Sequence, residues 1–408
     1  MIARKQAAVA AQSSTLFTRD NIHWRKKHGK EETHLSQDTV GILLNSSMYR
    51  GIPTRRTGQE WIAGYEETAR EFGLTPLFLR LGGIDPAGDS CIAYVYNGIE
   101  YVEQRLPLPS VLHNRAFYPR LAAQKKLQSL NERGIAIFNA NNRYGKDFIH
   151  RLLWNAPHLR AYLPAAMPLT SESLRRMMSR HPDLILKPIR GSVGHGVMRL
   201  RYAPSSGWEL TYASPMGEQK WNTVRLQRGE LPPWTRRTLR RTPYLVQERI
   251  PLAEFEQRPV DLRITVQRGS RGEWGVTGRF AKVAASGSFV CNIAKGGEAL
   301  PAEELLAKAL PERIVPSALA HVENLALEIS RHLGNRLPHL ADLGLDIGLT
   351  ASGRPYFIEC NGRDQRYGFR KAGLAETWKD SYRQPMAYAR YLLEQPADRR
   401  VSPKLASE

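Results

Sequence analysis

The sequence predicts a mixed fold of helices and strands, of the α/β or α+β class, arranged in two or three domains. Strand-like and helical segments alternate along the 408 residues. Hydrophobic residues make up 42% of the chain, which is enough to bury a sizeable core. The longest apolar runs are short and interrupted, so we expect no transmembrane segment.

The first predicted domain, residues 38–140, is mainly α/β. Its predicted helix, 57–73, has apolar residues at helical spacing and stops at Gly73, a residue suited to a helix end. The Asn97-Gly98 pair between two alternating runs predicts a hairpin. The other strands expected in this domain cover 39–45, 75–81, 110–115 and 134–140.

The second predicted domain, residues 141–393, alternates helices with longer strands. A helix over 146–160 precedes a second helix over 171–181, for which Ser171 is the expected N-cap. The strictly alternating run 260–268 predicts a strand with one polar face. Further strands are expected at 183–187, 197–200, 242–250, 274–285 and twice within 340–363, with a long helix over 316–334 and a frayed tail at 394–408.

The net charge of +20 indicates an affinity for polyanions. Part of the excess lies in a basic N-terminal arm, 1–37, for which an organellar presequence is the alternative, and part lies in 228–243. No RNA-binding aromatic signature, zinc finger or heptad pattern accompanies it, so we expect no specific nucleic-acid partner. The three cysteines, Cys91, Cys291 and Cys360, lack metal-ligand spacing and fit a reducing cytoplasm.

A glycine-rich loop separates two strand-like runs in "DLILKPIRGSVGHGVMRL", residues 183–200. Lys187 ends the first run, and Gly191, Gly194 and Gly196 follow it. Glycines allow backbone amides to surround an anion, and a lysine adds a point charge suited to phosphate. A hairpin with a glycine-rich tip remains an equal alternative, since the chain has neither a Walker A loop nor a GxGxxG fingerprint.

The last two predicted strands carry acidic and amide side chains. In "LGLDIGL" the alternation places Asp346 opposite to the apolar face, and in "YFIECN" Glu359 and Asn361 share a face. If Thr350 pairs with Pro355, Asp346 lies opposite Glu359. Two such carboxylates repel each other unless a cation separates them, and oxygen donors suit Mg²⁺. An ordinary polar sheet face is the alternative.

Two further stretches carry cations. Arg263 shares the polar face of its strand with Asp261 and could bind a phosphate or a developing oxyanion, or form a structural ion pair. After it come Lys282, Asn292 and the pair Gly296-Gly297, which could approach an anion or form a flexible loop.

The order of these features resembles the ATP-grasp superfamily over residues 141–365. "KPIRGSVGHGV" is similar to its phosphate-covering loop, "VQERI" to its adenine-binding hinge and "GLDIGLTASGRPYFIECN" to its magnesium-binding strands. Across 38–390 the closer resemblance is to the endospore coat-associated ATP-grasp proteins of the YheC/YheD type, through "VGILLN", "VLHNR", "IFNA", "GKDFIHRLL" and "PVDLRITVQ". It implies an ATP-grasp fold of two α+β subdomains, preceded by a Rossmann-like α/β domain that helps to bind substrate.

The resemblance also implies which residues bind Mg-ATP. The nucleotide phosphates would contact Lys146, Lys187 and the backbone amides of Gly191, Ser192, Gly194 and Gly196. The adenine would meet Val246, Gln247 and Glu248, and the ribose Glu254 or Glu256. Magnesium, with Mn²⁺ as an alternative, would be held by Asp346, Glu359 and Asn361, while Arg263, Lys282 and Asn292 would stabilise the transferring group.

Two departures from the pattern of general ligases affect these expectations. Lys282 stands where related ligases usually carry an arginine, which keeps the charge but changes the geometry. After Asn361 comes "GRDQR", where many ligases have a serine-proline or proline-glycine turn. The second departure concerns the acceptor side of the site more than the nucleotide side.

The implied activity is an ADP-forming carboxylate–amine or carboxylate–thiol ligase that acts through an acylphosphate. Its carboxylate and amine substrates are unknown; the basic charge favours acidic or cell-wall-derived acceptors. The alternatives are an ATP-binding protein of the spore coat or cortex without ligase turnover, and a kinase of the ATP-grasp fold. The implied location is cytoplasmic, with association with the spore coat or cortex.

Overall fold

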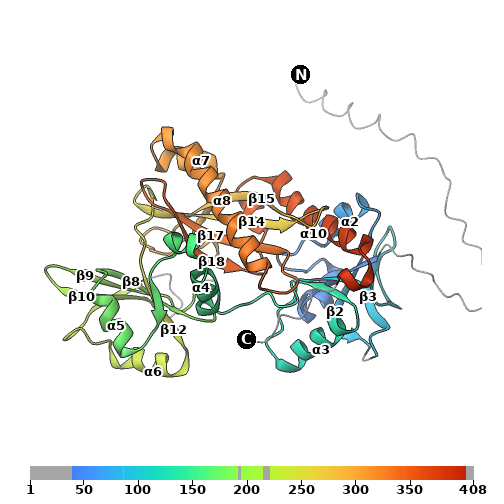
Figure 1. Cartoon of the computed structure of the whole chain (residues 1–408), viewed down its shortest axis with the longest axis horizontal. Coiled ribbons are helices and arrows are strands. Elements are labelled where there is room, and N and C mark those ends of the chain that lie inside the picture. The colour runs from blue at the N-terminus through green and yellow to red at the C-terminus, as the bar shows by residue number, and fades with distance from the viewer. Residues whose placement is uncertain (1–38, 86, 192–193, 215–220, 401–408) are drawn as a thin grey trace, which may run out of the picture. The chain divides into compact units, whose positions relative to one another are not determined.

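The computed structural model describes residues 39–400, apart from residue 86 and segments 192–193 and 215–220. The whole of the predicted basic arm, the predicted ligand Ser192 and the last residues of the predicted tail lie outside this part. The described residues form three six-stranded sheets, flanked by helices (Figure 1). None of the helices that the structure describes combines the length and the apolar character needed to cross a membrane.

The first sheet has the order β4-β3-β2-β1-β5-β6 and mixes parallel and antiparallel pairs. Its apolar strand β1 pairs in parallel with β2 and β5, and the predicted hairpin at Asn97-Gly98 joins β3 to β4. The helix predicted over 57–73 is confined to α2, and a helix that we did not predict, α3, follows β5. The elements are β1 Thr39–Leu43, α1 Ser46–Gly51, α2 Ile62–Arg70, β2 Thr75–Ile84, β3 Ser90–Tyr96, β4 Tyr101–Pro107, β5 Val111–Asn114, α3 Leu121–Glu132 and β6 Ala136–Phe138.

The second sheet, β11-β10-β9-β8-β12-β7, is antiparallel throughout. The N-cap of α5 is Thr170 rather than the predicted Ser171. The Thr170 hydroxyl accepts a hydrogen bond from the N–H of Ser173 at 3.0 Å, and the Thr170 N–H donates to the Ser173 hydroxyl at 2.8 Å. The elements are β7 Ala166–Pro168, α5 Ser171–Met178, β8 Asp183–Pro188, β9 Met198–Ala203, β10 Gly207–Ala213, β11 Trp221–Arg225, α6 Pro233–Arg241 and β12 Tyr244–Glu248.

The third sheet, β16-β15-β14-β17-β18 with β13 paired to β14, packs its apolar face against the long helix α8. The helix predicted over 146–160 ends as α4 at Trp154, and a 3₁₀ turn that starts at Pro157 follows it. The elements are α4 Lys146–Trp154, β13 Glu254–Phe255, β14 Arg258–Arg268, β15 Trp274–Val283, β16 Glu298–Leu300, α7 Ala302–Ala309, α8 Val315–Gly334, β17 Asp342–Leu349 and β18 Pro355–Asn361.

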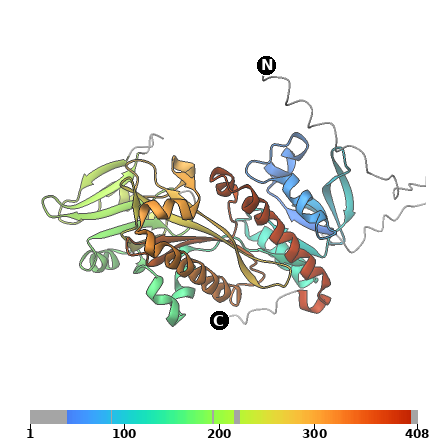
Figure 2. The same cartoon turned by 90° about the horizontal axis from the view of Figure 1, so that it is seen from above.

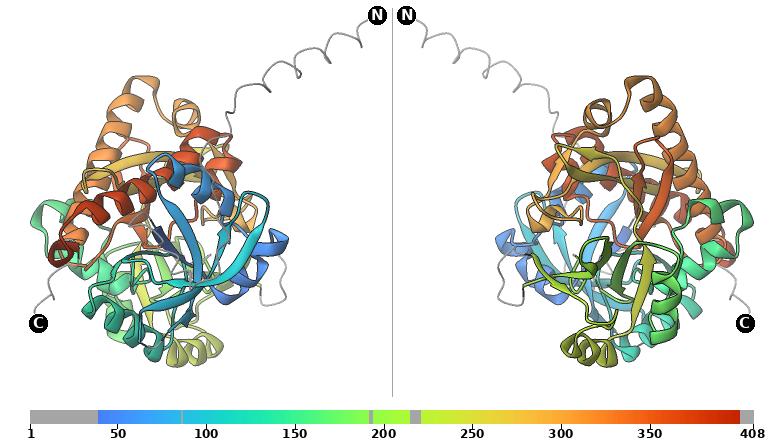
Figure 3. Two further views of the ribbon diagram at one scale, coloured as in Figure 1. Left: turned by 90° about the vertical axis from the view of Figure 1, so that its right-hand side faces the viewer. Right: turned by 90° about the vertical axis from the view of Figure 1, so that its left-hand side faces the viewer.

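The chain then returns to the first sheet through α9, Tyr367–Lys371, and α10, Ala375–Glu394; a short helix α11, Ala397–Arg400, follows. Apolar side chains of α10 share a hydrophobic core with α2 and β1, and Trp378 stacks on Trp61 with ring centroids 4.4 Å apart. Figures 2 and 3 show α10, in dark red, running beside the blue α2. A helix near the C-terminus therefore completes the core of the first sheet.

A buried ionic cluster also joins the first sheet to the third. Arg115, after β5, pairs with Glu60 at 2.7 Å and with Asp342 of β17 at 3.3 Å. Arg366 reaches the same Asp342 at 2.5 Å. All four side chains are buried, so each charge depends on its partners. The cluster fixes the position of the turn that follows β18.

Candidate functional site

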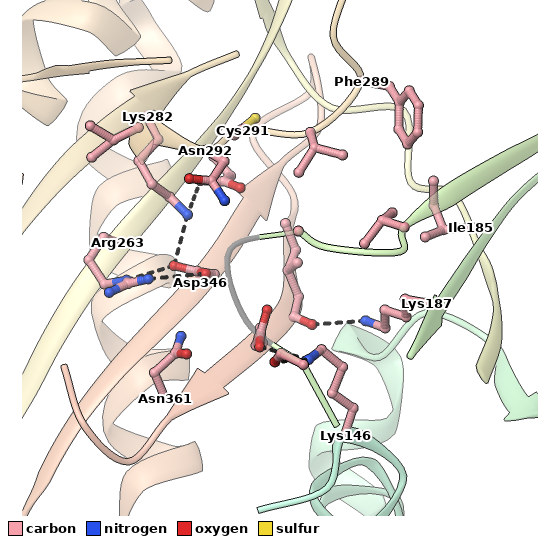
Figure 4. Close-up of a pocket in the computed structure, with 18 of the residues that line it drawn as sticks. Lys146, Ile185, Lys187, Arg263, Lys282, Phe289, Cys291, Asn292, Asp346 and Asn361 are labelled. Atoms are coloured by element: carbon pink, nitrogen blue, oxygen red, sulfur yellow. Dashed lines mark hydrogen bonds and ion pairs between the residues drawn. The ribbon is translucent and has the colours of Figure 1, made fainter. Parts of the chain in front are cut away.

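A cavity of about 250 Å³ lies between the second and third sheets (Figure 4). Its walls come from β8 and β12 on one side, from β14, β15, β17 and β18 on the other, and from the start of α4. Most residues that the sequence predicted as site residues line it, namely Lys146, Lys187, Gly191, Gly194, Gln247, Glu248, Arg263, Lys282, Asn292, Asp346, Glu359 and Asn361.

Four predicted residues within the described part of the chain do not line this cavity. Val246 is fully buried in the core of the second sheet because side chains alternate along β12, which turns its neighbour Gln247 toward the cavity. Glu256 lies in the turn between β13 and β14, where it pairs with Arg258 at 2.9 Å. Gly196 has a φ of +72°, and a Cβ there would come within 2.7 Å of the Tyr244 hydroxyl. The ribose candidate Glu254 is also absent from the lining.

Two lysines enter the cavity from the side of the second sheet. Lys187, on β8, is only 9% exposed, and burial lowers its pKa to about 8. Its ammonium group donates to the backbone oxygen of Ile358 at 3.4 Å. Lys146, the first residue of α4, lies 3.0 Å from a carboxylate oxygen of Glu359 and donates to the backbone oxygen of Gly191 at 3.1 Å. The two lysines therefore place two cations in the same cavity as Gly191 of the glycine loop.

The glycine loop also meets the segment that follows β15. Lys295 donates to the backbone oxygen of Gly194 at 3.0 Å. Asn292 lies beside Gly194, and its side-chain oxygen accepts from the N–H of Ala294 at 2.9 Å. The predicted site residue Asn292 is therefore held by a local turn, and its amide nitrogen lies near Gly194.

The predicted carboxylates face each other across β17 and β18, as the alternation suggested. Asp346 pairs with Glu359, although the turn has a different register from the predicted one. Leu349, not Thr350, pairs with Pro355, and a bulge at Ile358 restores the pairing of the two acids.

Asp346 is held by two cations from neighbouring strands. The Arg263 guanidinium contacts both of its carboxylate oxygens, at 2.7 and 3.3 Å, and the Lys282 ammonium lies 3.0 Å away. Burial by itself raises the pKa of Asp346, but these two cations outweigh it and lower the pKa to about 2. Lys282 also pairs with Asp261 at 2.9 Å, and burial raises the pKa of Asp261 above its usual range.

Asp364, for which we predicted no site role, is fully buried and accepts hydrogen bonds from Arg263 at 2.7 Å and from the Thr265 hydroxyl. It lies in "GRDQR", where Arg363 and Gln365 line the cavity while Asp364 and Arg366 point inward. The only local sign of a role for Asp364 was its position between two arginines. Its partner Arg263 lies 101 residues away in the sequence, so the sequence pattern did not reveal the pair.

A magnesium ion suits the donor chemistry of this wall. Asp346, Glu359 and Asn361 offer oxygen ligands, which Mg²⁺ prefers. Within the described residues, however, no group of three or more His, Cys, Asp or Glu side chains is arranged to hold a metal ion. The carboxylates are also paired with lysine and arginine. These residues therefore fit an ion whose remaining ligands are phosphate oxygens and water, rather than one enclosed by protein.

Two α+β sheets that enclose one cavity, with a lysine and a glycine loop on one side and paired acids on the other, define the ATP-grasp class. A family model described as YheC/D-like ATP-grasp matches residues 134–392. The chain belongs to this family, as the sequence predicted.

Comparisons with individual proteins agree with this assignment. The chain is 23% identical over 367 residues to the endospore coat-associated protein YheC of Bacillus subtilis (strain 168), covering 86% of this chain and 97% of that protein. It is 23% identical over 320 residues to YheD of the same organism, covering 74% and 67%. Among solved structures, the VanG D-Ala:D-Ser ligase from Enterococcus faecalis has a TM-score of 0.50 at 12% identity, covering 87% and 99%. The predicted ATP-grasp fold is confirmed.

Proposed function

We propose that this protein is an ATP-dependent ligase that activates a carboxylate as an acylphosphate and joins it to an amine or a thiol. One observation carries the proposal: cations on β8 and α4 share a cavity with Arg263, Lys282 and the opposed pair Asp346–Glu359. Phosphoryl transfer requires chiefly that the reactants are positioned and that the phosphate charge is neutralised. The cationic and acidic side chains of this cavity can do both.

In this proposal, the position of each side chain in the cavity determines its role. Lys146 and Lys187 bind the triphosphate, and the apolar side chains Ile185 and Leu252 provide a surface for the base. Arg263 and Lys282 stabilise the negative charge that develops on the transferring phosphoryl group. Magnesium held at the acidic wall would neutralise phosphate charge.

The named relatives support the finer parts of the proposal. VanG is a D-Ala:D-Ser ligase, and YheC and YheD are endospore coat-associated proteins. By analogy, we propose amino-acid or peptide substrates, cytoplasmic synthesis and association with the spore coat or cortex. The net charge of +20 supports acidic acceptors.

The test starts with calorimetric titration of the full chain with ATP, with and without Mg²⁺. We expect magnesium-dependent binding that Lys187→Met weakens and that Lys125→Met, at an exposed lysine of α3, leaves unchanged. Absence of magnesium-dependent binding would contradict the proposal.

A second assay measures ADP and phosphate release with amino acids, dipeptides and cell-wall fragments as substrates. The proposal predicts release that depends on both a carboxylate and an amine. Binding without release across the panel would favour the non-catalytic alternative, and a stable phosphorylated product would favour a kinase.

A further inference from the structure

A second cavity, of about 580 Å³, lies outside the nucleotide cavity. Its walls come from segment 52–70, from Tyr96 and Tyr101 of the β3–β4 hairpin, and from α9 and α10. Tyr367, at the start of α9, lines both cavities. The two cavities therefore share a wall at the end of the "GRDQR" turn.

Aromatic rings form much of the surface of the second cavity. The stacked pair of Trp61 and Trp378 lies on one side, and Tyr96 packs on Tyr101 with ring centroids 5.2 Å apart. None of these four rings is fully buried, and Tyr96 is 37% exposed. Such rings provide flat apolar faces against which the aliphatic parts of a bound molecule can pack.

Three arginines give this cavity a positive charge. Arg55, Arg70 and Arg370 line it, and among the described residues none of them has a carboxylate within 4 Å. Arg70 donates to the backbone oxygen of Glu66 at 3.2 Å, and the guanidinium of Arg370 lies over the ring of Trp378 at 5.7 Å. Their charges are therefore available to a ligand.

The acids of this cavity offset little of that charge. Glu60 is already paired with Arg115 at 2.7 Å. Burial raises the pKa of Glu66 to about 7, and its Oε1 atom is buried without a hydrogen-bond partner. Near neutral pH, Glu66 therefore carries only part of its negative charge.

The positive charge continues into the nucleotide cavity. Arg363 lines that cavity and donates to the backbone oxygen of Arg115 at 3.3 Å, with no carboxylate within 4 Å among the described residues. The nucleotide-side cations Lys146, Arg263 and Lys282 are, by contrast, all paired with acids. Unpaired arginines thus lie on both sides of Tyr367.

We propose that the second cavity binds the distal part of an extended acidic peptide whose reacting end lies beside Tyr367 in the nucleotide cavity. The aromatic rings would contact the aliphatic stems of its side chains, and the arginines would pair with its carboxylates. This inference rests on the proposed ligase function, because it names the substrate class of that site.

The test uses tetraglutamate as the probe, titrated by calorimetry into the full chain with and without Mg-ATP analogue. We expect tetraglutamate to bind at least about tenfold more tightly than glutamate or tetraglutamine, and this preference to fade near 1 M salt, where the Debye length is about 3 Å. Arg370→Gln and Arg55→Gln should each weaken tetraglutamate binding about five- to tenfold, with ATP affinity unchanged. Arg331→Gln, at an exposed arginine of α8 outside both cavities, is the matched control and should change neither.

Equal binding of tetraglutamine, no binding of tetraglutamate, or unchanged affinity in both cavity variants would overturn the inference. Preferential binding of a polyol-phosphate polymer such as teichoic acid without tetraglutamate binding would also overturn it. Since ATP binding is measured separately, loss of ATP binding would defeat the proposed ligase function, whereas intact ATP binding without a peptide preference would defeat only this inference.

Discussion

Replacement of Lys187 by methionine should stabilise the protein while it weakens ATP binding. Lys187 is 9% exposed, and its burial lowers its pKa from 10.5 to about 8. One pKa unit corresponds to about 1.4 kcal/mol, so holding the charged ammonium in the cavity costs about 3 kcal/mol at neutral pH. Methionine keeps the aliphatic stem and removes the charge.

The pH dependence of this effect has a definite sign. The folded protein holds the Lys187 proton less tightly than the unfolded chain, so the cost is complete below pH 8 and disappears as the pH rises toward 10.5. Lys187→Met should therefore raise the free energy of unfolding by about 1–3 kcal/mol at pH 7, and by much less near pH 10. Under the proposed role of Lys187 in binding the triphosphate, ATP affinity should fall about 10- to 100-fold, because the variant would lack a charged hydrogen bond to phosphate.

Urea denaturation followed by circular dichroism, at both pH values, measures the stability, and calorimetry measures the ATP affinity. Lys125→Met is the control, since an exposed lysine should change stability by less than about 0.5 kcal/mol. A variant less stable than the wild type at pH 7, or a gain in stability that stays constant up to pH 10, would refute the reasoning.

Three other substitutions test separate parts of the structure. Asp346→Asn leaves Arg263 and Lys282 without their shared buried carboxylate, so the free energy of unfolding, measured by urea titration, should fall by about 3–5 kcal/mol. An unchanged midpoint of unfolding would contradict the ion-pair geometry. Thr170→Ala removes the cap of α5 and should cost about 1 kcal/mol by the same assay, with ATP affinity unchanged. Burial lowers the pKa of His113 to about 4, so the free energy of unfolding of the wild type should fall by about 3 kcal/mol as the pH falls from 6.5 to 4. His113→Phe should make this dependence on pH less steep. Equal slopes in the two proteins would exclude the buried neutral imidazole.

Local sequence patterns predicted much of the fold because hydrophobic periodicity reflects which side chains are buried. The alternation around Arg263 and the long helix ending at Gly334 both match the structure. The same alternation placed Asp346 opposite Glu359, although it could not foresee the bulge that produces this pairing. Of the residues expected at the adenine, Gln247 and Glu248 line the cavity, whereas the side chain of Val246 belongs to the core of its sheet.

The sequence by itself predicted most of the strands, the helices α2, α4, α5 and α8, and the order in which the cationic and acidic side chains occur, because these depend on neighbours along the chain. Only the tertiary structure decided that Asp364 holds Arg263, that α10 completes the core of the first sheet, and that Tyr367 lines two cavities. These contacts join segments that lie far apart in the sequence. Their formation depends on how whole sheets pack, and that packing cannot be predicted from the spacing of residues along the chain.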